Sequence, residues 1–464
     1  MTDTTAGRLR GEGRPTRLLR AVSLQFGPRW IGLIVVALAA AGLSGRALYM
    51  DGVHHVIHSI FYWDWFPQPT PRRFFAVLWN TGLIRLIGIA GFRTIDIPTL
   101  LYALTTFSQL AIPAAVLAWS HIRQPLKSLL AAIYFSAILL LANFSVTESL
   151  FAIGLTTIFV AYTLDPESDP RGMSRFAVSL LLIASYESVA LSNVFLAASC
   201  WYTYRDGSLS PFMRRLLIVS LCIAPVFQVT WYVINPVPGA GIDLFVVELA
   251  LLQFALLLII AAYFKAVGNS ATLRYLAMAA ALIVPVSIFF LPQFLHVRSD
   301  LFRFAYPSRY YGMAAMGVIA LLPLLIGARF WSFPSKVMDW YGERAANDLG
   351  VAMCLLFCGV TLLSALDTLS FRLEMGKRFA AMSGEVPVAR CAFCIRPEAF
   401  GVADLGYPWI WQEYSMAYDM HTRSRHPVVI IIDDQATSFG KTEPSLSFSK
   451  TEIDSFIAKL KAGY

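Results

Sequence analysis

Charged residues are scarce in this 464-residue chain. Only 14% of its residues are Asp, Glu, Lys or Arg, whereas soluble domains carry about 25%. Hydrophobic residues make up 57%, and the mean hydropathy is +0.61. This balance excludes an ordinary soluble protein and a disordered chain, because both are far less apolar. Six cysteines in such a length also exclude a small disulfide-stabilised scaffold.

The common catalytic motifs are missing as well. The sequence has no Walker loop, no dinucleotide-binding GxGxxG after a strand, no HExxH zinc motif and no GxSxG nucleophile elbow. The formal net charge of +8 does not point to nucleic acid, because cationic loops on the cytoplasmic side of a membrane protein give the same excess. We therefore expect a lipid bilayer, and no nucleic acid, as a partner.

What the chain does have is long apolar runs. A helix needs about 20 mostly apolar residues to cross the hydrocarbon layer, so the sequence predicts an all-α polytopic membrane protein with about 11 transmembrane helices. The stretch 175–204 is too long for one helix and short for two. We expect two short helices that meet at a polar bend, Ser185–Ser188; a single tilted helix is the alternative. The predicted spans are residues 30–49, 97–119, 127–146, 149–164, 175–186, 188–204, 215–234, 243–264, 273–292, 310–329 and 349–368.

Basic residues set the predicted orientation. Residues 1–29 form an arginine-rich tail, which the positive-inside rule assigns to the cytoplasm. Alternation from there puts the short basic loops inside. The transmembrane domain covers residues 30–368. Alternation leaves its first loop, 51–96, and the tail after it, 369–464, outside the cytoplasm. Arg- and Ala-rich usage favours a bacterial inner membrane, with an endoplasmic-reticulum type of membrane as the alternative.

The first outer loop, 51–96, predicts two amphipathic helices in the plane of the membrane interface. In its first half Val53, Val56, Ile57, Ile60 and Phe61 repeat at helical spacing and make an apolar face. Asp51, His54, His55 and His58 make the opposite face. A second candidate helix covers about 72–92, after a proline-rich turn.

The tail 369–464 has a composition typical of soluble proteins. A β-branched run at 428–432 predicts a buried strand and 451–460 a short amphipathic helix. We expect a small extracytoplasmic α/β domain. Cys391 and Cys394 favour a disulfide outside the cytoplasm. A zinc site formed with the histidines further along the chain is less favoured, because the separation between the cysteines and those histidines exceeds the usual spacing of zinc ligands. A redox-active CxxC motif is also less favoured, because no thioredoxin-like βαβ pattern precedes it.

Three groups of residues are candidates for chemistry, because charges in or beside a membrane are costly. Asp51 with His54 and His55 can supply a general base, with imidazoles that bind phosphate; a divalent metal is possible but not favoured, and no other cofactor is implied. Alternatively, this stripe is the solvated face of its helix. Glu148 and Glu187, near outer span ends, can orient hydroxyl groups of a substrate or be plain helix-end residues.

Arginines form the third group. Three of them stand in the outside stretch 293–309, which the positive-inside rule leaves poor in cations. They suggest an anionic partner such as a lipid-linked phosphate, which guanidinium groups bind in pairs of hydrogen bonds. Anchoring to lipid headgroups is the alternative. The phosphate-binding candidates are Arg72, Arg73, Arg298, Arg303, Arg309 and Tyr310.

The layout and the run Tyr49-Met50-Asp51-Gly52-Val53-His54 resemble the GT-C superfamily of membrane glycosyltransferases. The run is similar to the Asp-Glu-x-His type of motif of the protein mannosyltransferase branch, with Gly52 where many relatives have a second acidic residue. The resemblance implies a polyprenyl-phosphate-sugar donor and a lipid, glycan or protein acceptor, with Asp51 as catalytic base or as a residue that orients the acceptor. A transporter or flippase, a glycan polymerase and an acyltransferase are the alternatives.

Overall fold

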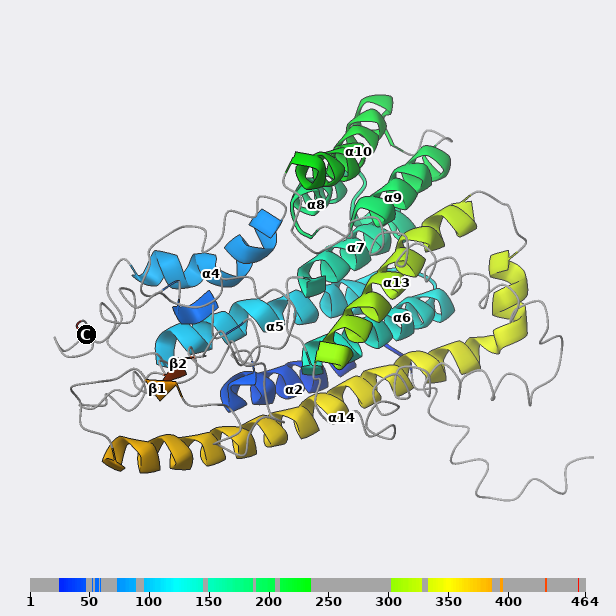
Figure 1. Cartoon of the computed structure of the whole chain (residues 1–464). Coiled ribbons are helices and arrows are strands. Elements are labelled where there is room, and N and C mark those ends of the chain that lie inside the picture. The colour runs from blue at the N-terminus through cyan, green and yellow to red at the C-terminus, as the bar shows by residue number, and fades with distance from the viewer. Residues whose placement is uncertain are drawn as a thin grey trace, which may run out of the picture.

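The computed structural model describes the chain in segments. These are residues 25–46, 52, 55–57, 59, 73–88, 96–144, 149–186, 189–204, 209–234, 302–327, 333–385, 393–394, 430–431 and 458. Almost all of this part is helical (Figure 1). The helices are α2 (Ile31–Ser44), α4 (Phe74–Gly88), α5 (Asp96–Trp119), α6 (Gln124–Phe144), α7 (Ser149–Leu164), α8 (Met173–Ile183), α9 (Val189–Thr203), α10 (Pro211–Ile234), α13 (Phe302–Gly327) and α14 (Phe333–Glu385), with short 3-10 turns at Pro28–Trp30 and Pro166–Ser168.

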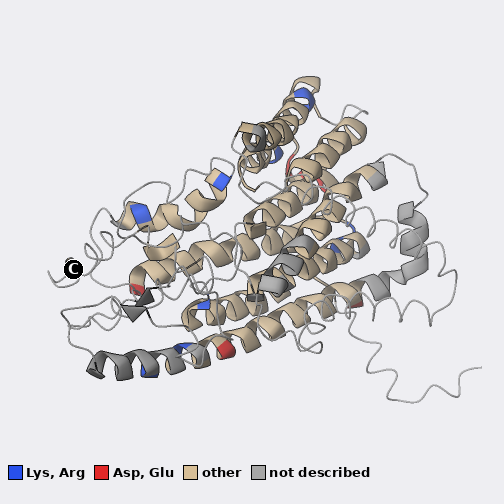
Figure 2. Ribbon diagram, viewed as in Figure 1, with Lys and Arg blue, Asp and Glu red and all other residues tan. Residues whose placement is uncertain are grey.

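Four of the described helices are long and apolar enough to cross a membrane. The qualifying stretches are Asp96–Trp119 in α5, Leu126–Asn143 in α6, Pro211–Trp231 in α10 and Asn347–Ser370 in α14. Charged residues lie mainly near the ends of the described helices (Figure 2). The protein is therefore a helical membrane protein. The larger count of spans stays a prediction, and the predicted spans 243–264 and 273–292 lie outside the described residues.

The bounds of α13 and α14 differ from those expected, whereas the stretch 175–204 forms two short helices, α8 and α9, as the sequence predicts. At about 17 Å and about 22 Å, each is shorter than the hydrocarbon layer of about 30 Å. Helix α13 begins at Phe302, so residues 302–309 are helix and not the loop that the sequence predicts. Helix α14 runs for 53 residues, through position 369, where the sequence analysis ends the transmembrane domain.

Helix α14 packs along α6 and α2, while α13 lies against α6, α7 and α9 (Figure 1). Helix α5 contacts α2, α4 and α7. Glycines permit the closest approaches, as is usual for helices in membranes. A Cβ atom at Gly154 would lie 2.8 Å from the carbonyl oxygen of Gln109, and one at Gly350 would lie 2.6 Å from that of Ser128. The helices thus share one buried core.

In the tail, the described residues include one short parallel pairing. Strand β1 (Phe393–Cys394) pairs with β2 (Ile430–Ile431). The second strand falls within the β-branched run 428–432. Two residues a strand do not make a domain, so the small α/β domain stays a prediction.

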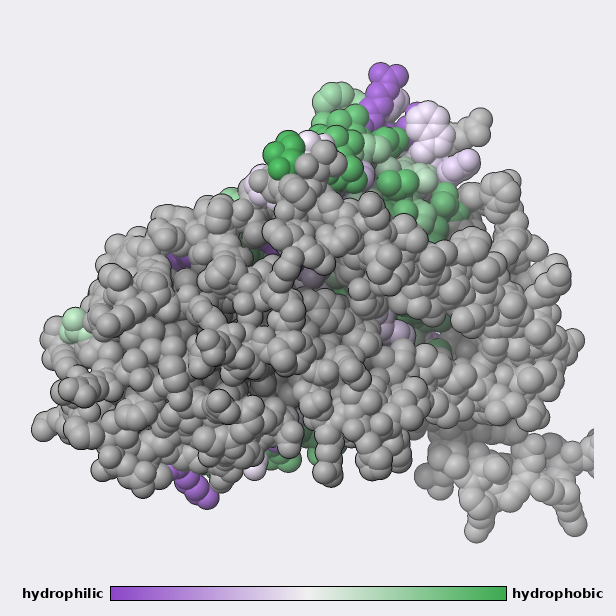
Figure 3. Space-filling model, in the orientation of Figure 1, coloured by the Kyte–Doolittle hydropathy of each residue, from purple (hydrophilic) through white to green (hydrophobic). Residues whose placement is uncertain are grey.

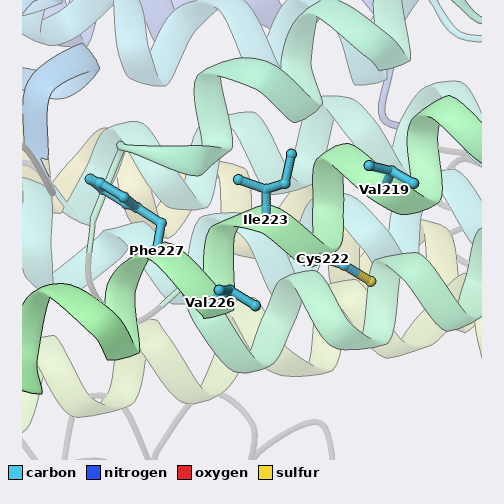
Figure 4. A pocket seen from close by; sticks show the side chains of 5 residues that line it. All are labelled: Val219, Cys222, Ile223, Val226 and Phe227. Atoms are coloured by element: carbon cyan, nitrogen blue, oxygen red, sulfur yellow. The ribbon is translucent and has the colours of Figure 1, made fainter.

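Apolar side chains cover the outer face of α10. Val219, Cys222, Ile223, Val226 and Phe227 border a shallow hollow of about 370 Å³ and project from one side of the helix (Figure 4). Hydrophobic side chains gather over this part of the surface (Figure 3). Such a face is costly in water. It suits contact with lipid chains.

Cys222, exposed on this face, allows a direct test of membrane contact. In a variant that keeps only this cysteine, a water-soluble maleimide is expected to react at least about tenfold more slowly in intact vesicles than after denaturation, because a polar reagent does not enter the hydrocarbon layer. A variant with Glu167→Cys as its single cysteine is the control, since Glu167 is exposed in the turn after α7. Equal labelling at the two positions in vesicles would contradict a lipid-facing α10.

Candidate functional site

The segment after α2 carries the first group of candidates, and the structure describes part of it. Residues 55–57 are helical, and Val56 and Ile57 are fully buried. His55, which the spacing puts on the polar face of this helix, is buried too, at 8% exposure. Its ring stacks on Tyr102 of α5 with the ring centroids 6.1 Å apart. At this position the histidine stripe therefore meets a membrane helix and not water.

The start of α4 is fastened to the bend between α8 and α9. The backbone N–H of Phe75 donates a hydrogen bond of 3.0 Å to the carbonyl oxygen of Ala184. The Arg73 guanidinium lies 4.9 Å from the centre of the Tyr186 ring, a cation–π contact. Glu187 follows Tyr186 in the chain. The structure thus brings Arg73, a candidate phosphate ligand, to the segment that leads into Glu187.

A row of hydrogen-bonded polar residues, here called the polar seam, joins α4 to α5. Asn80 accepts hydrogen bonds at its side-chain oxygen from Gln109 and Thr106, and its backbone oxygen accepts one from the Thr105 hydroxyl. The Trp79 indole N–H donates to the Ser108 hydroxyl at 3.0 Å. The side-chain oxygen of Gln109 is buried and has no hydrogen-bond partner. Sequence reasoning missed this seam because its residues are uncharged and lie in an apolar run.

The candidates near α13 are placed only by their backbone. Arg303, Arg309 and Tyr310 belong to the first turns of α13. The neighbouring Tyr311 is partly buried, and its hydroxyl is hydrogen-bonded to that of Ser136 in α6. This pair ties the start of the predicted tenth span to the middle of α6.

Most of the remaining candidate residues lie in segments that the structure does not describe. Asp51, His54, Arg72, Glu148, Glu187, Arg298 and Cys391 lie outside the described residues, and Cys394 is described only as a strand residue. The proposed Cys391–Cys394 disulfide and a pocket shared by Asp51 and the arginines therefore stay predictions. In the described part of the chain, no group of three or more His, Cys, Asp or Glu side chains could hold a metal ion.

A second polar cluster, absent from the sequence-based candidates, lies at the start of α8. Arg175 is 1% exposed, and its Nε lies 3.0 Å from the Asp169 carboxylate. Its guanidinium also donates to the Tyr204 hydroxyl and stacks on that ring. Arg214 of α10 donates to the backbone oxygen of Tyr204. The cluster fastens α8, α9 and α10 together, which points to a structural role.

At the same end of the bundle, the loop after α7 is hydrogen-bonded to the loop between α5 and α6. The Asp165 carboxylate accepts the backbone N–H of His121 at 2.7 Å and the Ser168 hydroxyl at 2.5 Å. Two of the loops that the sequence assigns to one side of the membrane are therefore in direct contact. This agrees with the predicted alternation of spans between them, although it does not identify the side.

Comparison with family models, with curated proteins and with solved structures finds no match to this chain.

Proposed function

We propose that the protein is a GT-C-like membrane glycosyltransferase in a bacterial inner membrane, with its N-terminus cytoplasmic. It transfers a sugar from a polyprenyl-phosphate donor to a lipid, glycan or protein acceptor outside the cytoplasm. The observation that supports this most is the attachment of α4 to the bend before Glu187. Arg73, a phosphate-binding candidate, lies against Tyr186, the residue that precedes the separately chosen catalytic candidate Glu187 in the chain.

The physical requirements of such a reaction match these residue types. A polyprenyl-phosphate donor stays in the bilayer with its sugar at the surface. The acceptor hydroxyl attacks the anomeric carbon and passes its proton to the Asp51 carboxylate. The bond between that carbon and the phosphate oxygen breaks, and polyprenyl phosphate leaves with the electron pair. Arg73 and the α13 arginines would stabilise the negative charge on the phosphate.

The proposal is tested with purified protein in lipid nanodiscs, a panel of polyprenyl monophosphates that each carry one ¹⁴C-labelled sugar, and delipidated cell-envelope acceptor. Asp51→Asn is expected to lower transfer at least about 100-fold, because the amide cannot take the proton. Glu167→Gln, at an exposed carboxylate, is the control and is expected to keep wild-type transfer. Full activity of the Asp51→Asn protein, folded as the wild type, would remove Asp51 from this role.

Arg73→Gln gives an independent readout. Loss of a charged phosphate ligand is expected to raise the KM for the donor by about tenfold. Arg171→Gln is the matched control, since Arg171 is an exposed arginine in the turn before α8. A fall in kcat with an unchanged KM would mean that Arg73 acts through the bend and not on the phosphate.

A transporter or flippase is the second candidate. Helices α8 and α9 are short halves that meet at a polar bend, a feature of transporters. Just beyond the bend, the buried Ser192 hydroxyl and both amide atoms of Asn193 have no hydrogen-bond partner. Movement of a labelled polyprenyl-phosphate sugar across liposomes, equal in wild type and in Asp51→Asn, would favour this function over transfer.

A further inference from the structure

Among the described membrane spans, α10 is the one that the rest of the protein covers least. Only 28% of its apolar window is buried, against 50% in α5 and in α14 and 82% in α6. The hollow on this helix is lined by side chains from Val219 to Phe227 (Figure 4). Because the hollow is on the outer face of the bundle, the hydrocarbon chain of a lipid can lie along it.

An exposed arginine stands at the polar end of the same face of α10. Arg215 precedes Val219 by about one helical turn. The exposed side chains recur at helical spacing, at positions 215, 219, 222, 223 and 226. At a rise of about 1.5 Å per residue, Arg215 is about 6 Å from the level of Val219 and about 18 Å from that of Phe227. The hydrocarbon layer is about 30 Å thick, so arginine and hollow fit within about one leaflet.

The first turn of α10 has the residue types of a membrane surface. A short connection joins α9, which ends at Thr203, to α10, which begins at Pro211, so these two ends lie on the same side of the bundle. The large aromatic side chains of Trp201 and Phe212 are exposed there. Hydrophilic side chains border the hydrophobic area at this end (Figure 3). Aromatic and basic residues together are typical of the boundary between hydrocarbon and headgroups.

The positive charge at the start of α10 has no carboxylate beside it in the described part of the chain. Arg214 donates one hydrogen bond, of 3.2 Å, to the backbone oxygen of Tyr204, and its Nε is buried without a hydrogen-bond partner. Arg215 is exposed. The carboxylate of Asp169, at the same end of the bundle, is already paired with Arg175. Both Arg214 and Arg215 therefore have guanidinium donors available for an anion.

We propose that α10 binds one anionic phospholipid of the bilayer, with its phosphate at Arg215 and Arg214 and one acyl chain in the hollow from Val219 to Phe227. Guanidinium groups bind phosphate through paired, charge-assisted hydrogen bonds. A free anion would leave the hollow unused, and an uncharged lipid would leave the arginines without a counter-charge. An anionic lipid matches both parts.

This proposal depends on the membrane location of the protein and not on sugar transfer. The predicted orientation puts the start of α10 in the cytoplasmic leaflet, on the other side of the bilayer from the proposed transfer site. The lipid site and the transfer activity therefore hold or fail separately.

Photo-crosslinking of the full chain in lipid nanodiscs tests both parts of the site together. The photoreactive amino acid benzoylphenylalanine replaces Val226 in the hollow or, as the control, Leu363 on α14; these side chains are 66% and 67% exposed. The nanodiscs contain phosphatidylcholine and a trace of radiolabelled probe, either dioleoyl phosphatidic acid or dioleoyl phosphatidylcholine. At position 226 phosphatidic acid is expected to crosslink at least about tenfold more than phosphatidylcholine, and at position 363 within about twofold of it.

Two arginine variants, each made in the protein with the photoreactive residue at position 226, separate this site from a general attraction of anionic lipid. Arg215→Gln is expected to lower the ratio of phosphatidic acid to phosphatidylcholine about fivefold, because one charge contact to the phosphate is lost. Arg171→Gln is the control, because Arg171 is an exposed arginine in the turn before α8. Its ratio is expected to stay within about twofold of the parent protein.

Each other outcome overturns the proposal. A ratio near one at position 226 removes the anionic headgroup as the recognised group. Equal ratios at positions 226 and 363, or equal losses in Arg215→Gln and Arg171→Gln, leave only a general attraction. Crosslinks from position 226 to protein and not to lipid would assign this face to another segment or a second copy of the chain. Displacement of the lipid by millimolar inorganic phosphate would assign the arginines to a free anion.

A second measurement applies if Arg215→Gln loses the wild-type elution profile. The ratio at position 226 is then followed in the parent protein at increasing NaCl concentration. It is expected to fall, because salt screens the attraction between exposed charges. A ratio that does not change with salt would contradict the part assigned to the arginines.

Discussion

Replacing Arg175 with alanine is expected to lower the free energy of unfolding by about 3–5 kcal/mol, the usual result of removing one partner from a buried ion pair. The loss comes mainly from Asp169, which is 5% exposed and would keep its charge without a cation. In addition, the Tyr204 hydroxyl would lose its guanidinium partner. The measurement is unfolding in mixed micelles of increasing denaturing-detergent fraction, followed by circular dichroism.

Arg171→Ala is the control for charge and position, because Arg171 is exposed four residues earlier. Its effect is expected to stay within about 0.5 kcal/mol. Adding Asp169→Asn to Arg175→Ala should restore part of the lost stability, since the uncompensated charge is removed. The recovery is partial because Asp169 also accepts the backbone N–H groups of Ser174 and Arg175 at the start of α8. Equal effects of Arg175→Ala and Arg171→Ala would refute a stabilising role for the ion pair.

Apolar runs bounded by charges were predicted well from the sequence. The predicted span 149–164 coincides with α7, because Glu148 and Asp165 mark a sharp change in polarity. The bounds of α14 could not be found in this way. A hydropathy pattern ends where charges begin, whereas helix formation continues through Ala, Glu, Met, Lys and Arg. A helix of 53 residues is about 80 Å long, so it extends beyond the hydrocarbon layer when its apolar window crosses it.

Candidate sites were harder to predict, because burial depends on contacts between distant parts of the chain. Arg175 belongs to a loop that the positive-inside rule treats as cationic and solvated. The structure buries it against Tyr204, 29 positions away. His55 was assigned to the polar face of its helix from its spacing alone, and Tyr102 of α5 stacks against it.

Gly350→Val and Gly359→Val form a matched pair on α14 that tests how closely this helix approaches α6. A Cβ atom at Gly350 would lie 2.6 Å from the Ser128 carbonyl oxygen and 3.0 Å from the Ser128 Cα. Both are backbone atoms, which cannot rotate away, so the helices must separate. At Gly359 nothing lies within 4 Å of that position. Valine at either position gains the same helix propensity over glycine, so the difference between the variants isolates the contact with α6.

Gly350→Val is expected to lose about 2–3 kcal/mol of unfolding free energy, in the range of an overpacked core, while Gly359→Val is expected to change it by less than about 0.5 kcal/mol. The loss includes the hydrogen bond of 2.8 Å that the Ser128 hydroxyl donates to Asn347 at the same contact. Mixed-micelle unfolding again supplies the free energies. Helix α14 packs more extensively against α6 than against any other described helix. Equal stabilities of the two variants would therefore contradict the arrangement of helices around α6.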